Sequence, residues 1–216
     1  MSDEEEFYSQ FNTDYLSDYS HDIELFWKLF FLKDFLLTKI NSNKQQIMGS
    51  FEVILSAIRL VDNNDVVSAN LNLRLSLDIF IKQMAIFSNI PEQVGKTFGY
   101  YNDQYFKVIT NFLKSNLTDY DDAVHDAMEA KDLGQYLYSE LSEITHGRNL
   151  GEREYSLYFN VLPNQKPEEQ KECIEKVSNV IEYIFHATYY ESYLDNEYRG
   201  IFKFSKYSKY FKNHNY

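Results

Sequence analysis

The sequence predicts an all-α fold, an antiparallel bundle of about six to seven helices with an acidic N-terminal arm and a basic, aromatic C-terminal tail. Seven glycines and three prolines among 216 residues are too few turn-forming residues for a many-stranded sandwich or barrel. Hydrophobic residues make up 44% of the chain, enough for a full core. Over long segments they recur every three or four positions, which is the spacing of one helix face.

The distribution of charge indicates three parts: an arm at residues 1–18, a bundle domain at residues 19–193 and a tail at residues 194–216. The net charge is −12, which argues against a protein-wide basic surface for nucleic acid. The two ends have opposite signs, because residues 1–27 contain no Lys or Arg and residues 199–216 contain no Asp or Glu.

The first half of the chain predicts helices at residues 23–40, 46–61 and 66–88. Apolar residues cover more than half the circumference of the first helix, so we expect it to be central. The polar segment NSNK separates the first two helices, and DNND separates the second from the third. The second of these segments also supplies a cap for the helix that follows.

The second half predicts helices at residues 91–113, 123–130, 133–146 and 167–193. Pro91 can occupy the first turn of its helix, and Pro167 opens the last one. Gly147 fits the left-handed residue that ends a helix. Residues 155–162, YSLYFNVL, alternate enough to form a strand or an extended arm.

The cysteine and hydropathy patterns indicate a cytoplasmic protein. Cys173 is the single cysteine, so no disulfide can form within the chain. The most apolar run, residues 25–37, contains Lys28, Lys33 and Asp34 and is too short and too charged to span a bilayer. We therefore expect no membrane partner.

Common catalytic and cofactor motifs do not occur in the sequence. There is no phosphate-binding glycine loop, dinucleotide fingerprint, HExxH motif or GxSxG elbow. The histidines are far apart; they are His21, His125, His146, His186 and His214. Di-iron bundles need paired Glu-x-x-His motifs, and only Glu143 and His146 have that spacing. We expect neither a cofactor nor a metal site.

Arg74 and Asp78 stand out within an otherwise apolar helix. They are four residues apart, so they share one face near the border of the core. A buried arginine must be paired, and Asp78 is its nearest candidate partner. His146 lies at the end of another predicted helix, where the helix dipole favours an imidazolium.

These residues leave three alternatives open. Arg74, Asp78 and His146 can satisfy one another across two helices and hold the bundle together. They can instead form a catalytic or ligand-binding group, with Arg148 just beyond the helix end. The third alternative is that they make no mutual contact. The structural network is the favoured interpretation.

Two short motifs carry a family resemblance: Arg74-Leu75-Ser76-Leu77-Asp78, and the segment from Tyr138 to Gly147 that reads Y-x-x-L-S-x-x-x-H-G. Across about residues 45–190 the chain resembles HEPN-like domains, which are helical proteins of antiviral defence and toxin–antitoxin systems. Many of these act as dimeric, metal-independent ribonucleases. The resemblance implies an RNA-directed effector or a degenerate regulator of a bacterial or phage conflict system.

The candidate catalytic residues are His146, Arg148, Arg74 and Asp78, and the same resemblance implies roles for the first three. His146 would move a proton to or from the ribose 2′-hydroxyl or the leaving oxygen. Arg148, with Arg74 as a further candidate, would stabilise the charged transition state. Asp78 stands where the family pattern has Glu, and no Arg precedes His146 with four to six residues between them. The resemblance therefore supports the fold more than it supports ribonuclease chemistry.

Basic residues elsewhere are candidates for nucleic-acid binding. Arg148 and Arg153 lie in the loop GRNLGERE, which could clamp phosphate or be solvated. In the tail, lysines recur every third residue between aromatic rings, at Lys203, Lys206, Lys209 and Lys212. They could bind single-stranded nucleic acid. The favoured alternative is that the tail packs on the bundle or mediates self-association.

The expected partners are a second copy of the chain in a homodimer, and either RNA or another protein. The alternative function is a non-enzymatic acidic interaction module, such as an adaptor, immunity protein or inhibitor. A chain with a net charge of −12 can cover a basic partner or mimic nucleic acid.

Overall fold

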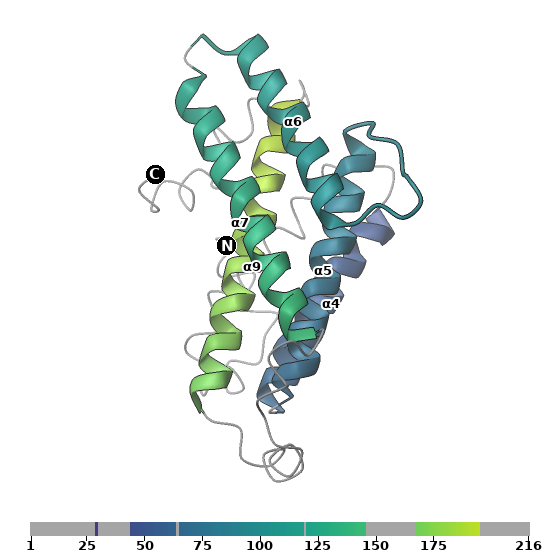
Figure 1. Ribbon diagram of the computed structural model, residues 1–216, viewed down its shortest axis with the longest axis vertical. Helices are drawn as coiled ribbons and strands as arrows, with labels where there is room; N and C mark the ends of the chain where they lie inside the picture. Colours follow the sequence, from purple (N-terminus) through teal and green to yellow (C-terminus); the bar gives the residue numbers. More distant parts are fainter. Residues whose placement is uncertain (1–28, 30–43, 64, 119, 146–166, 195–216) are drawn as a thin grey trace, which may run out of the picture.

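Five helices form the described part of the molecule. The computed structural model describes residues 29, 44–63, 65–118, 120–145 and 167–194. The helices are α4 (Lys44–Asp62), α5 (Val66–Phe87), α6 (Phe98–Asn116), α7 (Asp121–Thr145) and α9 (Pro167–Leu194). They pack side by side along the long axis of the molecule (Figure 1). In the part of the chain that the structure describes, the predicted all-α bundle is therefore confirmed.

Helix α5 lies at the centre of the bundle, since it packs against α4, α6, α7 and α9. Its buried side chains recur every three or four residues, so a broad face is directed into the core. The fully buried members include Leu73, Leu77, Phe80, Ile81 and Met84. Leu29 joins this core from the predicted helix at residues 23–40, whose other residues lie outside the described part.

Three predicted helices agree with the observed bounds of α4, α5 and α9 to within two residues. The polar segment DNND acts as predicted, because a side-chain oxygen of Asp65 accepts a hydrogen bond from the Ser68 amide at 3.1 Å. This contact satisfies one of the unpaired amides of the first turn and fixes the start of α5.

The predicted start of a helix at Pro91 is wrong, because α6 begins at Phe98. Residues 88–97 form a loop that extends away from the bundle (Figure 1). Asn89 and Gly95 have left-handed backbone conformations, with φ values of 57° and 78°, which a helix cannot accommodate. The Tyr101 hydroxyl holds the loop, since it accepts from the Gln93 amide at 2.9 Å and donates to the Gln93 carbonyl at 3.2 Å.

The predicted break between residues 130 and 133 is also wrong, because α7 is one continuous helix. Lys131 and Asp132, the residues at the predicted break, are both compatible with a helix. Lys131 is also fixed by its neighbours. Its ammonium lies 2.8 Å from an Asp103 carboxylate oxygen, and its carbonyl accepts a hydrogen bond from Asn102 at 2.9 Å.

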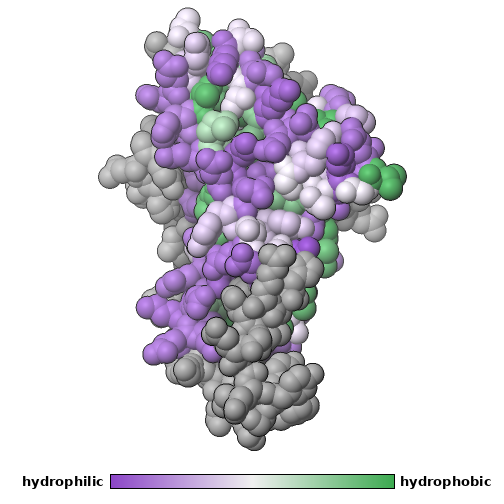
Figure 2. Space-filling view, in the orientation of Figure 1, coloured by the Kyte–Doolittle hydropathy of each residue, from purple (hydrophilic) through white to green (hydrophobic). Residues whose placement is uncertain are grey.

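The face of the molecule in Figure 2 is mainly hydrophilic, and hydrophobic atoms reach it in small areas. Among the described residues, no helix is long and apolar enough to span a membrane. The predicted acidic arm, the extended segment at residues 155–162 and the basic tail lie outside the described residues.

Candidate functional site

The candidate site is a hydrogen-bonded group that joins α5 to α7. An Arg74 guanidinium nitrogen donates to the Tyr138 hydroxyl at 3.2 Å, and this hydroxyl donates to an Asp78 carboxylate oxygen at 3.2 Å. Arg74 and Asp78 occupy one face of α5, as their four-residue spacing predicts. Tyr138 comes from α7 and lies between the two charged groups, so one phenol links a cation and an anion of the neighbouring helix.

Aromatic packing fixes the position of Tyr138. Its ring stacks on the buried Phe98 ring, with centroids 4.6 Å apart and an interplanar angle of 7°. The guanidinium carbon of Arg74 lies 5.2 Å from the Tyr138 ring centroid, within the range of a cation–π contact. Burial raises the pKa of the Tyr138 hydroxyl; the hydrogen bond from Arg74 opposes this effect, and the Asp78 charge adds to it. The phenol therefore stays protonated at neutral pH and can donate to Asp78.

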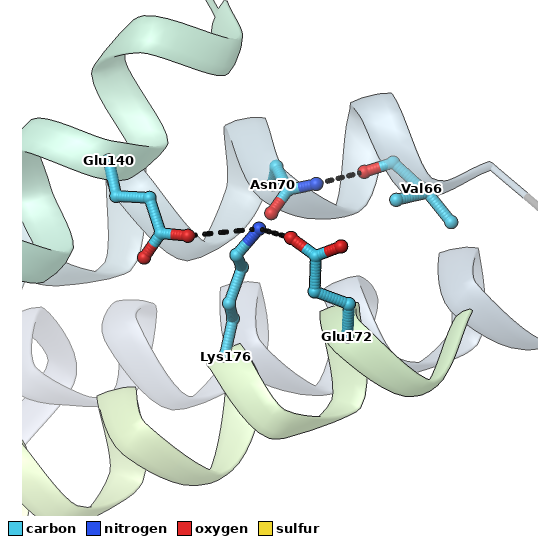
Figure 3. Close-up of polar contacts among 5 residues, drawn as sticks. All are labelled: Val66, Asn70, Glu140, Glu172 and Lys176. Carbon is cyan, nitrogen blue, oxygen red and sulfur yellow. Dashed lines mark hydrogen bonds and ion pairs between the residues drawn. The ribbon is translucent and has the colours of Figure 1, made fainter. Parts of the chain in front are cut away.

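A second polar group lies where α5, α7 and α9 meet (Figure 3). The Lys176 ammonium lies 2.7 Å from a Glu172 carboxylate oxygen and 3.3 Å from a Glu140 carboxylate oxygen. Lys176 is only 7% exposed. A buried ammonium needs such partners, because the loss of its hydration shell is costly. The lysine therefore ties its own helix, α9, to α7.

Asn70 completes this group from α5. The residue is 2% exposed, and its amide nitrogen donates to the Val66 carbonyl at 2.8 Å. The side-chain oxygen has no hydrogen-bond partner among the described residues and points toward Lys176 (Figure 3). Asn70 lies four residues before Arg74 and eight before Asp78, so one row on α5 contributes to both polar groups.

The pKa of Lys176 reflects two opposing effects. Burial lowers it, but the hydrogen bond to Glu172 and the negative charges of Glu140 and Glu172 together outweigh burial and raise it above the ordinary value of 10.5. The lysine is therefore charged in the folded protein at neutral pH. Its ion pairs link the helices, and the raised pKa keeps the amine from acting as a neutral base or nucleophile at neutral pH.

Cys173, one helical turn before Lys176, is buried. Burial raises the pKa of its thiol to about 11, although the Lys176 charge opposes this shift. The thiolate is the nucleophilic form, so burial and the raised pKa both slow its reactions.

We therefore expect a thiol reagent at pH 8 to label Cys173 in the folded protein on the order of a hundredfold more slowly than in the protein in urea. Equal labelling rates in the two states, followed by absorbance, would contradict the burial of this side chain.

Among the described residues, one exposed group has ligand types that a metal can use: His125, Asp126 and Glu129 on α7. A ring nitrogen of His125 lies 3.6 Å from a Glu129 carboxylate oxygen. Side chains four residues apart on an exposed helix face form such pairs without a metal. We assign this group no further role.

The structure brings together two of the predicted site residues, Arg74 and Asp78. The predicted catalytic residues His146 and Arg148 lie outside the described residues, as do the predicted nucleic-acid-binding residues Arg153, Lys203, Lys206, Lys209 and Lys212. Sequence reasoning missed the roles of Tyr138 and Lys176. Tyr138 belongs to the motif that carries the family resemblance, and the spacing of Glu172 and Lys176 is that of a helical ion pair.

Comparisons with known proteins give no match for this chain, whether with protein-family models, with curated proteins or with solved structures.

Proposed function

We propose that this protein is an HEPN-like helical protein of a bacterial or phage conflict system, and that it acts as a regulator that does not cleave RNA. The arrangement of Arg74, Tyr138 and Asp78 carries this proposal. Both charged residues are half-buried and are engaged by a protonated phenol between two helices. Such a group stabilises the packing of α5 against α7. A catalytic pair must instead present its polar atoms to a substrate.

The sequence before His146 supports the same proposal. The resembled ribonucleases have an arginine separated from the histidine by four to six residues, but residues 139–141 of this chain read SEL and contain no arginine. Without that cation, the charge that develops on the phosphate in the transition state lacks a fixed partner on the same helix. Arg148 follows the histidine and does not restore this spacing.

The direct test is incubation of the pure protein with total RNA and with tRNA in buffer containing a chelator. The regulator is expected to leave both RNAs intact over several hours, as is the His146→Ala variant. The contradicting result is cleavage by the wild type that is lost in His146→Ala and kept in the matched α7 variant Glu143→Gln. This result would show that the protein is a metal-independent ribonuclease and not a regulator.

A second candidate function is an acidic module that binds a basic protein. The observation that favours it is the exposure of acidic side chains along the first half of α7, at Asp121, Asp122, Glu129 and Asp132. Such a surface attracts a basic partner and speeds its association.

Affinity purification from the native host separates this module from a regulator that binds RNA alone. A stoichiometric protein partner is expected with the wild type. It should be lost at physiological salt when Asp122, Glu129 and Asp132 are replaced by Asn, Gln and Asn. If both forms retain the same partner equally, α7 is not the surface that binds it.

A further inference from the structure

The first half of α7 carries an acidic face that is directed partly toward α9. We call the exposed residues Asp122, Glu129 and Asp132 the α7 acidic face. Asp122 and Glu129 precede Glu140 by about five and about three helical turns, so they point in nearly the same direction from the helix axis as Glu140. Because Glu140 reaches Lys176 of α9, this is the side of α7 that α9 approaches.

Among the described residues, no lysine or arginine forms an ion pair with the α7 acidic face. Glu129 lies near His125, with 3.6 Å between a carboxylate oxygen and a ring nitrogen. Lys131, on the same helix, is engaged by Asp103 of α6. Helix α9 contains no lysine or arginine after Lys176. The next cationic side chains along the chain therefore belong to the C-terminal tail.

The chain leaves α9 at the end of the bundle where α7 begins (Figure 1). The two helices are antiparallel, because Lys176 of α9 meets Glu140 of α7, whereas Tyr183, further along α9, meets Gly134, which comes earlier in α7. The end of α9 at Leu194 is thus at the level of the first turns of α7. A chain that continues from this point needs no long connection to reach the α7 acidic face.

We propose that the basic tail docks on the α7 acidic face of the same molecule, where it competes with basic protein partners. The segment at residues 199–216 contains no Asp or Glu. Its charge is therefore opposite to that of the α7 acidic face, whereas the acidic arm at residues 1–18 would be repelled. The cationic side chains of the tail are Arg199, Lys203, Lys206, Lys209 and Lys212.

The spacing of charge supports this pairing. The tail lysines recur at every third residue. A chain in the polyproline II conformation presents every third side chain on one side, about 9 Å apart. Asp122 and Glu129 are about 10 Å apart along the axis of α7, because a helix rises about 1.5 Å per residue. Two successive lysines can therefore each meet one carboxylate.

The contact is weak in each pair and is supported by being intramolecular. Exposed ion pairs contribute little individually, and salt screens them. A short linker, however, holds the tail at an effective concentration of about a millimolar, so a basic partner at micromolar concentration must displace it. This inference concerns the surface of the second candidate function and does not rest on it, since docking of the tail requires no partner.

The first test measures whether the tail reaches α7 in the full chain. A nitroxide spin label is attached at Ser208→Cys by brief labelling, which spares the buried Cys173. The amide NMR signals of residues 121–132 should be lost. Those of residues 55–62 should remain, because the end of α4 lies at the opposite end of the bundle, where the Val61 carbonyl accepts from Gln170 near the start of α9.

Neutralising the α7 acidic face by Asp122→Asn, Glu129→Gln and Asp132→Asn should restore the lost signals, and about 0.5 M salt should do the same. An equal mixture of spin-labelled protein and isotope-enriched protein without a label should show no signal loss. Signal loss in this mixture would place the tail on a second copy of the chain and overturn docking within one molecule.

The matched control for the neutralised face is the triple variant Glu52→Gln, Glu92→Gln and Glu168→Gln. It changes the net charge by the same amount at exposed positions outside α7. The spin label should still remove the signals of residues 121–132 in this variant. Circular dichroism checks that both triple variants fold.

The second test measures competition, with a synthetic peptide of residues 199–216 as the probe. In isothermal titration the peptide should bind the full-length variant Lys203→Gln, Lys206→Gln, Lys209→Gln and Lys212→Gln about tenfold more tightly than the wild type, whose own tail occupies the surface.

Three further results would overturn the proposal. They are wild-type α7 signals that the spin label leaves intact, signal loss that persists when the α7 acidic face is neutralised, and equal affinities of the peptide for the two proteins, including no binding to either. None of them decides whether the host contains a basic protein partner, which the affinity purification tests separately.

Discussion

Replacing Gly134 by alanine is expected to destabilise the protein by about 2 kcal/mol or more, because α7 has no room for a side chain at this position. A methyl group there would lie 2.7 Å from Cδ2 and 2.8 Å from Cζ of the Tyr183 ring, and closer still to Cε2. The ring cannot easily move, since it is fully buried and its hydroxyl donates to Asn102 at 2.8 Å. This clash exceeds the roughly 1 kcal/mol that alanine gains over glycine in a helix.

Urea unfolding measures this effect, and the matched control is Gly49→Ala in α4. The nearest atom to a methyl group at Gly49 is a side-chain carbon of Ile79 at 4.0 Å, an ordinary contact. The control is therefore expected to stabilise the protein by about 0.5–1 kcal/mol through helix propensity. If both substitutions stabilise the protein, the packing of Tyr183 against α7 is not as described.

Replacing Lys176 by methionine is expected to cost about 2 kcal/mol. Removing one partner of a buried ion pair typically costs about 3–5 kcal/mol, because the other charge is left without compensation. The expected cost is smaller here, since the Glu172 side chain is 63% exposed and keeps much of its hydration. Methionine retains an apolar chain of similar length, so the loss reports on the charge and not on a cavity.

The stability difference between the wild type and Lys176→Met is expected to depend on pH, because the pKa of Lys176 is raised. A lysine with a raised pKa in the folded state stabilises the protein fully below its unfolded value of 10.5 and loses that contribution as the pH rises through the folded value. The difference in unfolding free energy between wild type and Lys176→Met should thus be constant from pH 8 to 10 and shrink above pH 10.5.

Lys107→Met, at an exposed position on α6, is the control and should change stability by less than about 0.5 kcal/mol. An equal loss of unfolding free energy in Lys176→Met and Lys107→Met would argue against a stabilising role for the buried ion pairs of Lys176.

The helices could be predicted from the sequence wherever apolar periodicity coincided with clear boundary residues. Asp65 caps α5 and Pro167 opens α9, so both starts were predicted correctly. The start of α6 was not, because proline is compatible with both a first helical turn and a loop. Its placement in a loop depends on the hydroxyl of Tyr101, eight residues beyond Gln93, and sequence spacing does not reveal that contact.

The candidate site was predictable only within single helices. The spacing of Arg74 and Asp78 indicated a shared face, because both residues belong to α5. Their contact with Tyr138 spans at least 60 residues of sequence and depends on how α7 rotates and slides against α5. The same limit applies to Lys176, whose contact with Glu140 joins two helices. Local patterns report which way a side chain faces, and tertiary packing decides what it meets.

The central position of α5 has a consequence for cooperativity. Since α4, α6, α7 and α9 all pack against this one helix, none of them can detach without exposing part of its apolar surface to water. The bundle is therefore expected to unfold as a single unit, and partial opening of one helix should be rare. A change on any outer helix, whether a substitution or a bound partner, is in this way transmitted to the stability of the whole domain.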